Sequence, residues 1–256
     1  MTELHYISRW KNCLDELSQL VQPMDSVMHC RLQPSNNPGP QGDILARMIK
    51  IFPLKSTGAY VDVGASHPCE CSNTWPYYQA GWRGLLIEPF EGFWYSLLRN
   101  RRGDILEPVG AFNCDGIANL RISGNVSSFR PDWNIQEDSI RPTEIETLKT
   151  ILSRYPDIRD ACKFCSIDTE GTEPQVLDGI DWDTFHPEVF IIEYRTYEGT
   201  AVNGEPQLMG SDESEPLYER LKPHGYVEIC RNDLNVIYGT QDAYKRYHGQ
   251  ENVPTT

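Results

Sequence analysis

The sequence predicts an α/β protein built on a mostly parallel sheet. Short apolar segments alternate with segments of helical periodicity from residue 42 to residue 193. Strands that alternate with helices form parallel sheets with helices on both faces. Near the end of the chain, residues 226–230 and 235–238 flank a short turn, which predicts a hairpin and an antiparallel edge to the sheet.

The expected elements follow in regular order. Strands are predicted over residues 60–63, 84–88, 105–111, 164–168 and 189–193, and helices over residues 42–52, 75–80, 93–100 and 174–177. Asp43 near the start of the first helix and Gly81 after the second fit the preferences of helix termini.

Two further segments accompany this alternation. Residues 1–40 are expected to form an N-terminal helical extension and linker, because apolar residues recur at helical spacing over 7–20 and a turn-rich stretch follows. Residues 41–256 form the main domain. Within it, residues 113–162 are an insert, with a strand near 118–123 and a helix over 141–152. Its place beside the strand ends suggests a substrate cover, and a surface excursion is an equally good interpretation.

Composition limits the kind of partner. The 256 residues suffice for one substantial α/β domain, and the formal net charge of −14 disfavours binding to nucleic acid. Arg99, Arg101 and Arg102 lie at the end of a predicted helix, where cations favour the helix dipole. No apolar stretch is long enough to span a bilayer, and the first residues lack the features of a secretory signal. We therefore expect a cytoplasmic protein that binds no membrane.

The eight cysteines are expected to be mostly reduced thiols. Cys69 and Cys71, with Cys162 and Cys165, have spacings that would also suit a four-thiolate zinc site. In the predicted strand 164–168, Cys165 shares a face with an isoleucine rather than with the polar residues. We favour the interpretation of Cys165 as a small buried apolar residue.

The first chemical motif is an apolar strand that ends at Gly64, in the sequence YVDVGA (residues 60–65). Glycine lets the next turn bring its backbone close to a ligand, because it has no Cβ. In such sheets the ligand crevice lies outside the carboxyl ends of the strands. A dinucleotide fingerprint would need two more glycines, and none follows Gly64 in Ala-Ser-His-Pro, so a nicotinamide dehydrogenase is disfavoured.

The second motif is Glu88, at the end of the strand GLLIE. An acidic residue at this place accepts hydrogen bonds from the two ribose hydroxyls of a nucleoside. Glu88 follows Asp62 by 88 − 62 = 26 positions, close to one strand–helix–strand step. A solvated glutamate is the plainer alternative, and the glycine turn in register favours the ribose role.

The third motif joins two acidic strand ends, Asp168 with Glu170 after one strand and Glu193 after the next. Close carboxylates can act as a general base, with one pKa raised by the other, or can hold a hard divalent cation. Alternatively, Asp168 or Glu170 caps the following helix. For Asp168 we favour the site, and for Glu170 both interpretations stay open.

These motifs together resemble the FkbM family of S-adenosylmethionine-dependent methyltransferases. The resemblance covers residues 41–238 and rests on VDVGASHPCECSNT (61–74), GWRGLLIEP (81–89), SIDTEGTEPQVLDGI (166–180) and VFIIEY (189–194), with PQGDILARMIKIF (40–52) as a lead-in helix. It implies a Rossmann-like class I methyltransferase fold, with a seven-stranded, mostly parallel sheet whose last strand is antiparallel.

The resemblance also implies where the cofactor S-adenosyl-L-methionine binds. Asp62, Gly64 and Ala65 would surround its methionine part, Glu88 its ribose, and Gly110 and Ala111 its adenine. Many methyltransferases have an acidic residue here for the adenine amine, whereas this chain has Gly-Ala-Phe-Asn (110–113), so adenine recognition falls to backbone groups or to Asn113. The full set of expected cofactor contacts is Asp62, Gly64, Ala65, Ser66, Asn73, Glu88, Pro89, Gly110, Ala111 and Asp168.

The expected activity is O-methylation of a small-molecule acceptor, a sugar or a polyketide-like hydroxyl. The protein must align the acceptor and take its proton. Asp168, Glu170 and Glu193 are the candidate groups, with His67 behind them, while His186 is expected to be structural. We favour a site without metal, in which Asp168 binds the cofactor's amino group, and a divalent cation at Asp168 and Glu193 stays open. A homo-oligomer is compatible with the sequence, and a non-catalytic binding or regulatory module of the same fold is the alternative.

The insert supplies one further hypothesis. Ser127, Ser128, Arg130 and Trp133 fall within a short loop, 125–134. An arginine and an aromatic face beside hydroxyls suit a sugar ring or a carboxylate-bearing acceptor. Equally, Arg130 pairs with a surface acid and Trp133 packs the insert onto the sheet.

Overall fold

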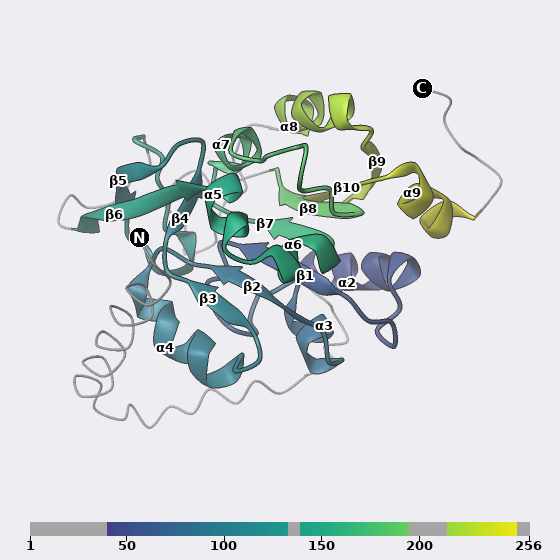
Figure 1. Ribbon diagram of the computed structural model, residues 1–256, viewed down its shortest axis with the longest axis horizontal. Helices are drawn as coiled ribbons and strands as arrows, with labels where there is room; N and C mark the ends of the chain where they lie inside the picture. Colours follow the sequence, from purple (N-terminus) through teal and green to yellow (C-terminus); the bar gives the residue numbers. More distant parts are fainter. Residues whose placement is uncertain (1–39, 133–138, 195–213, 250–256) are drawn as a thin grey trace, which may run out of the picture. The chain divides into compact units, whose positions relative to one another are not determined.

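The computed structural model describes residues 40–132, 139–194 and 214–249 (Figure 1). The helix expected over 7–20 and most of the expected linker lie outside these residues. Among the described helices, none combines the length and apolar character needed to cross a membrane.

Seven strands form the main sheet, in the spatial order β3-β2-β1-β7-β8-β10-β9. They are β1 (Ala59–Val63), β2 (Arg83–Ile87), β3 (Ile105–Glu107), β7 (Cys162–Ile167), β8 (Val189–Glu193), β9 (Val227–Arg231) and β10 (Asn235–Gly239). β10 runs antiparallel to both of its neighbours, β8 and β9, and the other six strands all point the same way. This confirms the predicted sheet, in which the last strand alone is reversed.

Helices cover both faces of the sheet, because successive strand residues point to opposite sides. One core contains Val61, Cys165 and Ile192, and it packs against α5 (Leu148–Ser153), α6 (Pro156–Ala161), α7 (Glu173–Asp178) and α8 (Ser214–Leu221). The other contains Tyr60, Phe164 and Ile191. It packs against α2 (Pro40–Ile51), α3 (Trp75–Gln79), α4 (Glu91–Asn100) and α9 (Gln241–His248).

A second sheet joins two strands of the insert to a strand just before it and corrects two expectations. It contains β4 (Gly110–Phe112), β6 (Ile140–Thr147) and β5 (Gly116–Arg121), in that order. The strand expected over 105–111 splits at Pro108, which has no N–H to donate to a ladder. The helix expected over 141–152 is wrong in its first half: residues up to Thr147 belong to β6, and Pro142 lies within them. The helix α5 begins only at Leu148, where the Thr147 side chain accepts a hydrogen bond from the Thr150 N–H.

Arg101, expected as a helix-end surface cation, is buried instead, with 2% exposure. Its guanidinium donates to the Asp104 carboxylate, the Tyr60 and Thr74 hydroxyls and the Pro68 carbonyl. Arg101 thereby ties the loop after β1 to the end of α4. Sequence position could not reveal these partners, since most lie 27 to 41 residues away.

Candidate active site

The turn after β1 is held against the ends of β2 and β7. The N–H groups of Gly64 and Ala65 both donate to the Ile87 carbonyl, and the Asp168 N–H donates to the Val63 carbonyl. Gly64 has a φ of +79°, and a Cβ there would lie 1.8 Å from the Asp168 carbonyl oxygen. Only glycine allows this close approach of three strand ends.

Glu88 follows β2 and is almost fully buried, with 5% exposure. One carboxylate oxygen accepts from the Ser66 N–H and the other from the Phe90 N–H, each at 2.7 Å. Burial raises the pKa of Glu88 to about 7, although these two hydrogen bonds oppose the rise. Since each carboxylate oxygen can accept a second hydrogen bond, Glu88 has capacity for two neighbouring hydroxyl groups.

A cavity opens to solvent at these strand ends. Eight of the expected site residues line it: Gly64, Ser66, Glu88, Pro89, Gly110, Ala111, Asp168 and Glu170. Its apolar walls include Phe93, Leu120 and Phe129, which the sequence did not single out. Gly110 leaves room for the Phe129 ring, which a Cβ would approach to 2.4 Å. Asn113, the alternative adenine contact, is exposed and is not among the lining residues.

Three further expected cofactor contacts lie behind the cavity lining. The buried Asp62 carboxylate accepts a hydrogen bond from the Thr74 hydroxyl, and burial raises its pKa to about 6. Asn73 donates to the Ser166 hydroxyl, and Ala65 is buried in the core beside α2 and α3. In this structure, all three support the loop that carries Ser66.

His67 is engaged with its own loop. Its Nδ1 atom accepts a hydrogen bond from the Glu70 N–H at 2.9 Å. His67 is not among the residues that line the cavity, so its expected contact with the acceptor stays a prediction. His186, expected to be structural, lies beside the Trp182 ring, away from the strand ends that form the cavity.

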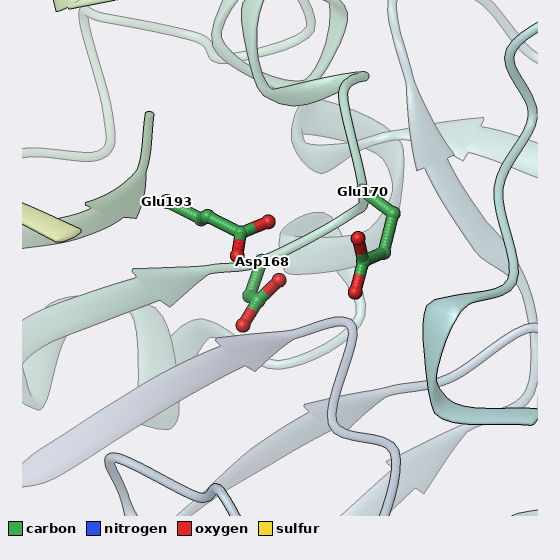
Figure 2. A group of neighbouring side chains, drawn as sticks. All are labelled: Asp168, Glu170 and Glu193. Atoms are coloured by element: carbon green, nitrogen blue, oxygen red, sulfur yellow. The ribbon is translucent and has the colours of Figure 1, made fainter. Parts of the chain in front are cut away.

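The acidic strand ends converge as expected. Oxygen atoms of Asp168, Glu170 and Glu193 all lie within 4.8 Å of one another. Figure 2 shows the Asp168 and Glu193 carboxylates side by side, with Glu170 reaching toward them from the loop after β7. Glu170 and Gly171 adopt positive φ values of 56° and 92°, which turn this loop sharply. Asp168 and Glu170 line the cavity, whereas Glu193, beside Asp168, is not among the lining residues.

The loop before α7 is held by a residue that the sequence analysis did not name, and the N-cap residue, Thr172, makes no side-chain cap hydrogen bond. The Glu173 carboxylate accepts from the N–H groups of Thr169 and Gly171. Glu170 Oε2 is buried and has no hydrogen-bond partner. The capping alternative for Asp168 and Glu170 is therefore not supported by the contacts.

This cluster strongly disfavours negative charge. Burial, followed by the nearby Asp168 and Glu173, raises the pKa of Glu170 to about 9. Burial is also the main cause that raises the pKa of Asp168 and, well above its usual range, that of Glu193. A cation or protons would relieve the repulsion among these carboxylates.

The insert contributes to the cavity through Leu120, Gly124, Asn125, Ser127 and Phe129. Ser128 is buried, and its hydroxyl donates to the Glu170 carbonyl. Arg130 pairs with Asp132 and packs closely over Gly171. This agrees with the interpretation in which Arg130 pairs with a surface acid. Trp133 lies outside the described residues.

Cys69, Cys71, Cys162 and Cys165 do not form the alternative four-thiolate zinc site. Cys69 is disulfide-bonded, whereas Cys71, Cys162 and Cys165 are free. Cys165 is fully buried in the core, as favoured. Among the described residues, the only group with metal-ligand spacing is the acidic cluster.

The sheet order, the reversed β10 and the cavity at the carboxyl ends define a Rossmann-like protein with the class I methyltransferase arrangement. The chain belongs to the FkbM methyltransferase family, because the family model described as "Methyltransferase FkbM domain" matches residues 62–227. The protein is accordingly a methyltransferase. A comparison with curated proteins finds no match.

Two solved structures are distantly similar. One is a precorrin-6y C5,15-methyltransferase from Geobacter metallireducens GS-15, with 15% identity and a TM-score of 0.36 over 75% of this chain and 84% of that one. The other is a Burkholderia thailandensis 1,6-didemethyltoxoflavin-N1-methyltransferase with bound 1,6-didemethyltoxoflavin and S-adenosylhomocysteine. It has 11% identity and a TM-score of 0.34, over 81% of this chain and 93% of that one. The family match, and not these structures, carries the assignment.

Proposed function

We propose that this methyltransferase transfers the methyl group of S-adenosylmethionine to a hydroxyl oxygen of a small molecule, such as a sugar or a polyketide-like alcohol. The observation that carries the proposal is Glu88, a buried carboxylate at the end of β2 that lines the cavity. Its remaining hydrogen-bonding capacity suits the two hydroxyls of a ribose.

The surrounding residues fit the rest of this cofactor. The Ser66 hydroxyl is buried at the cavity and has no partner among the described residues. Phe93, Leu120 and Phe129 offer apolar surface for an adenine ring, beside the backbone of Gly110 and Ala111. The carboxylates of Asp168 and Glu170 favour the positive sulfonium and ammonium groups. We assign Asp168 to the ammonium group.

The acceptor's proton goes to the acidic cluster. The sulfonium supplies a methyl group that is already activated, so this chain must align the acceptor and remove its proton. As the new carbon–oxygen bond forms, the carbon–sulfur bond breaks, and Glu170 takes the hydroxyl proton. A carboxyl with a raised pKa is a stronger base once ionised, and bound positive charge favours its ionised form.

The test is a transfer assay with methyl-labelled S-adenosylmethionine and matched acceptors that carry a hydroxyl, an amine or a thiol on the same sugar or polyketide-like skeleton. We expect label to appear on the hydroxyl compounds alone. Transfer to the amine in preference to the hydroxyl would contradict O-methylation, and binding of the cofactor without transfer to any acceptor would favour the non-catalytic alternative.

A further inference from the structure

The carboxylates of the half-buried Asp168 and the buried Glu170 and Glu193 converge without a positive partner. In the part of the chain that the structure describes, neither Lys, Arg nor His forms an ion pair with Asp168, Glu170 or Glu193. Glu170 is 8% exposed and Glu193 is 5% exposed. One oxygen of each is buried without a hydrogen-bond partner. Such oxygens are costly unless something binds them.

Asn235 supplies an independent observation. It begins β10 and is paired with Glu193 of β8. The Tyr194 N–H donates to the Leu234 carbonyl, so the adjacent pair Glu193–Asn235 is of the non-hydrogen-bonded type, in which opposite side chains lie closest. Both side chains face the core that contains Ile191 and Ile237.

The amide oxygen of Asn235 is unsatisfied as well. The residue is 2% exposed, and its Oδ1 atom is buried without a hydrogen-bond partner. A lone pair on an amide oxygen next to an acidic cluster is not explained by repulsion among carboxylates. A positive ligand would give both kinds of oxygen a partner.

The donor set is that of a hard cation. It consists of carboxylate oxygens and one amide oxygen, the ligands that Mg²⁺ and Ca²⁺ prefer. Two oxygens on opposite sides of a Ca²⁺ ion, each at about 2.4 Å, lie about 4.8 Å apart. The carboxylate oxygens here lie within 4.8 Å of one another.

We propose that Asp168, Glu170 and Glu193, with the Asn235 amide oxygen, bind a hard divalent cation at the end of the cavity. The cation's role in methyl transfer rests on the proposed function. A cation at this place would lower the pKa of an acceptor hydroxyl beside it. The binding site itself can be tested without cofactor or acceptor.

The test is titration of the metal-free full chain with Mn²⁺, followed by electron paramagnetic resonance, with Mg²⁺ and Ca²⁺ as competitors. We expect one saturable Mn²⁺ site per chain, displaced by at least one competitor. Glu193→Gln should weaken Mn²⁺ binding at least tenfold, and Asn235→Ala at least threefold. Circular dichroism identifies any variant that fails to fold, and the two substitutions test the site separately.

Glu173→Gln is the matched control. Glu173 is a neighbouring buried carboxylate that raises the pKa of Glu170, but its Oε1 atom is occupied by loop donors that a glutamine can also bind. Mn²⁺ affinity should change less than twofold in this variant. Absence of saturable binding at millimolar Mn²⁺, or equal weakening by Glu173→Gln and Glu193→Gln, would overturn the proposal.

The proposed function fails in a different way. Saturable Mn²⁺ binding that is lost in Glu193→Gln, together with no transfer to any hydroxyl, would uphold the cation site and contradict O-methylation. Transfer to hydroxyls that persists at full rate in excess chelator, without saturable Mn²⁺ binding, would uphold the function and overturn the site.

Discussion

Gly64 brings the ends of β1 and β7 together with a backbone conformation that other residues rarely adopt. Its φ is +79°, and an added Cβ would lie 1.8 Å from the Asp168 carbonyl oxygen. We expect Gly64→Ala to lower the free energy of unfolding by on the order of 3 kcal/mol, because strain and overlap add. Urea denaturation measures this change.

Gly81→Ala is the control for Gly64→Ala. Gly81 also has a positive φ, +102°, but no atom lies within 4 Å of the position of its Cβ. The loss in the free energy of unfolding should then reflect only the cost of a positive φ for a residue with a Cβ, about 1–2 kcal/mol. Equal losses in the two variants would show that the close approach to Asp168 is unimportant.

Glu170 should make the stability of the protein depend on pH. Its pKa is about 9 in the folded protein, against 4.5 as the ordinary value. Between these values the folded state holds a proton that the unfolded chain has released, so stability falls as pH rises from about 4.5 to about 9. We expect the free energy of unfolding to drop by on the order of 2–4 kcal/mol from about pH 5 to pH 8.

Glu170→Gln separates this residue from the other buried carboxylates. The variant should lose less stability over the same pH range, because the amide does not titrate. Urea denaturation of the metal-free protein at pH 5 and pH 8 provides the comparison, since a bound cation would itself keep Glu170 ionised. Parallel pH profiles for the variant and the parent would contradict the assignment.

At the scale of elements, the insert brings an aromatic side chain, Phe129, to the cavity. Phe129 lines the cavity and packs against Gly110, whereas Arg130 is paired with Asp132. We expect Phe129→Ala to weaken S-adenosylhomocysteine binding by about 1–2 kcal/mol through lost apolar contact. Arg130→Ala should change it by less than about 0.5 kcal/mol, as is usual for an exposed ion pair.

Calorimetry on both variants tests which part of the insert contacts the cofactor. Equal, small effects would leave the insert as packing alone, the alternative that the sequence left open. A larger loss in Arg130→Ala than in Phe129→Ala would favour the original hypothesis of an arginine that contacts a ligand.

An element could be predicted from the sequence when the interactions that form it are local, between residues close together in the chain. The strands of the main sheet have local apolar patterns, and their mostly parallel arrangement follows from alternation with helices. The strand break at Pro108 and the strand β6 were not predicted. In β6, pairing with β4 and β5 overrides a local pattern that resembles a helix.

At the scale of the whole molecule, the same distinction applies to the candidate site. Gly64, Glu88, Asp168 and Glu193 could be selected because each ends a strand, and strand ends of a parallel sheet meet at one edge. Asn235 and Phe129 could not be selected. Asn235 depends on the β8–β10 register, and Phe129 on the way the insert folds back over Gly110.

The central claim is that Glu88 binds the ribose of S-adenosylmethionine, and calorimetry with S-adenosylhomocysteine tests it most directly. We expect micromolar binding, a gain of about 8 kcal/mol, to the parent protein. Glu88→Ala should weaken binding by about 1–3 kcal/mol through loss of a charged acceptor. Glu228→Ala, which removes a carboxylate paired with Arg231 on β9, should leave binding unchanged. Affinity that is equal in Glu88→Ala and the parent would contradict the account.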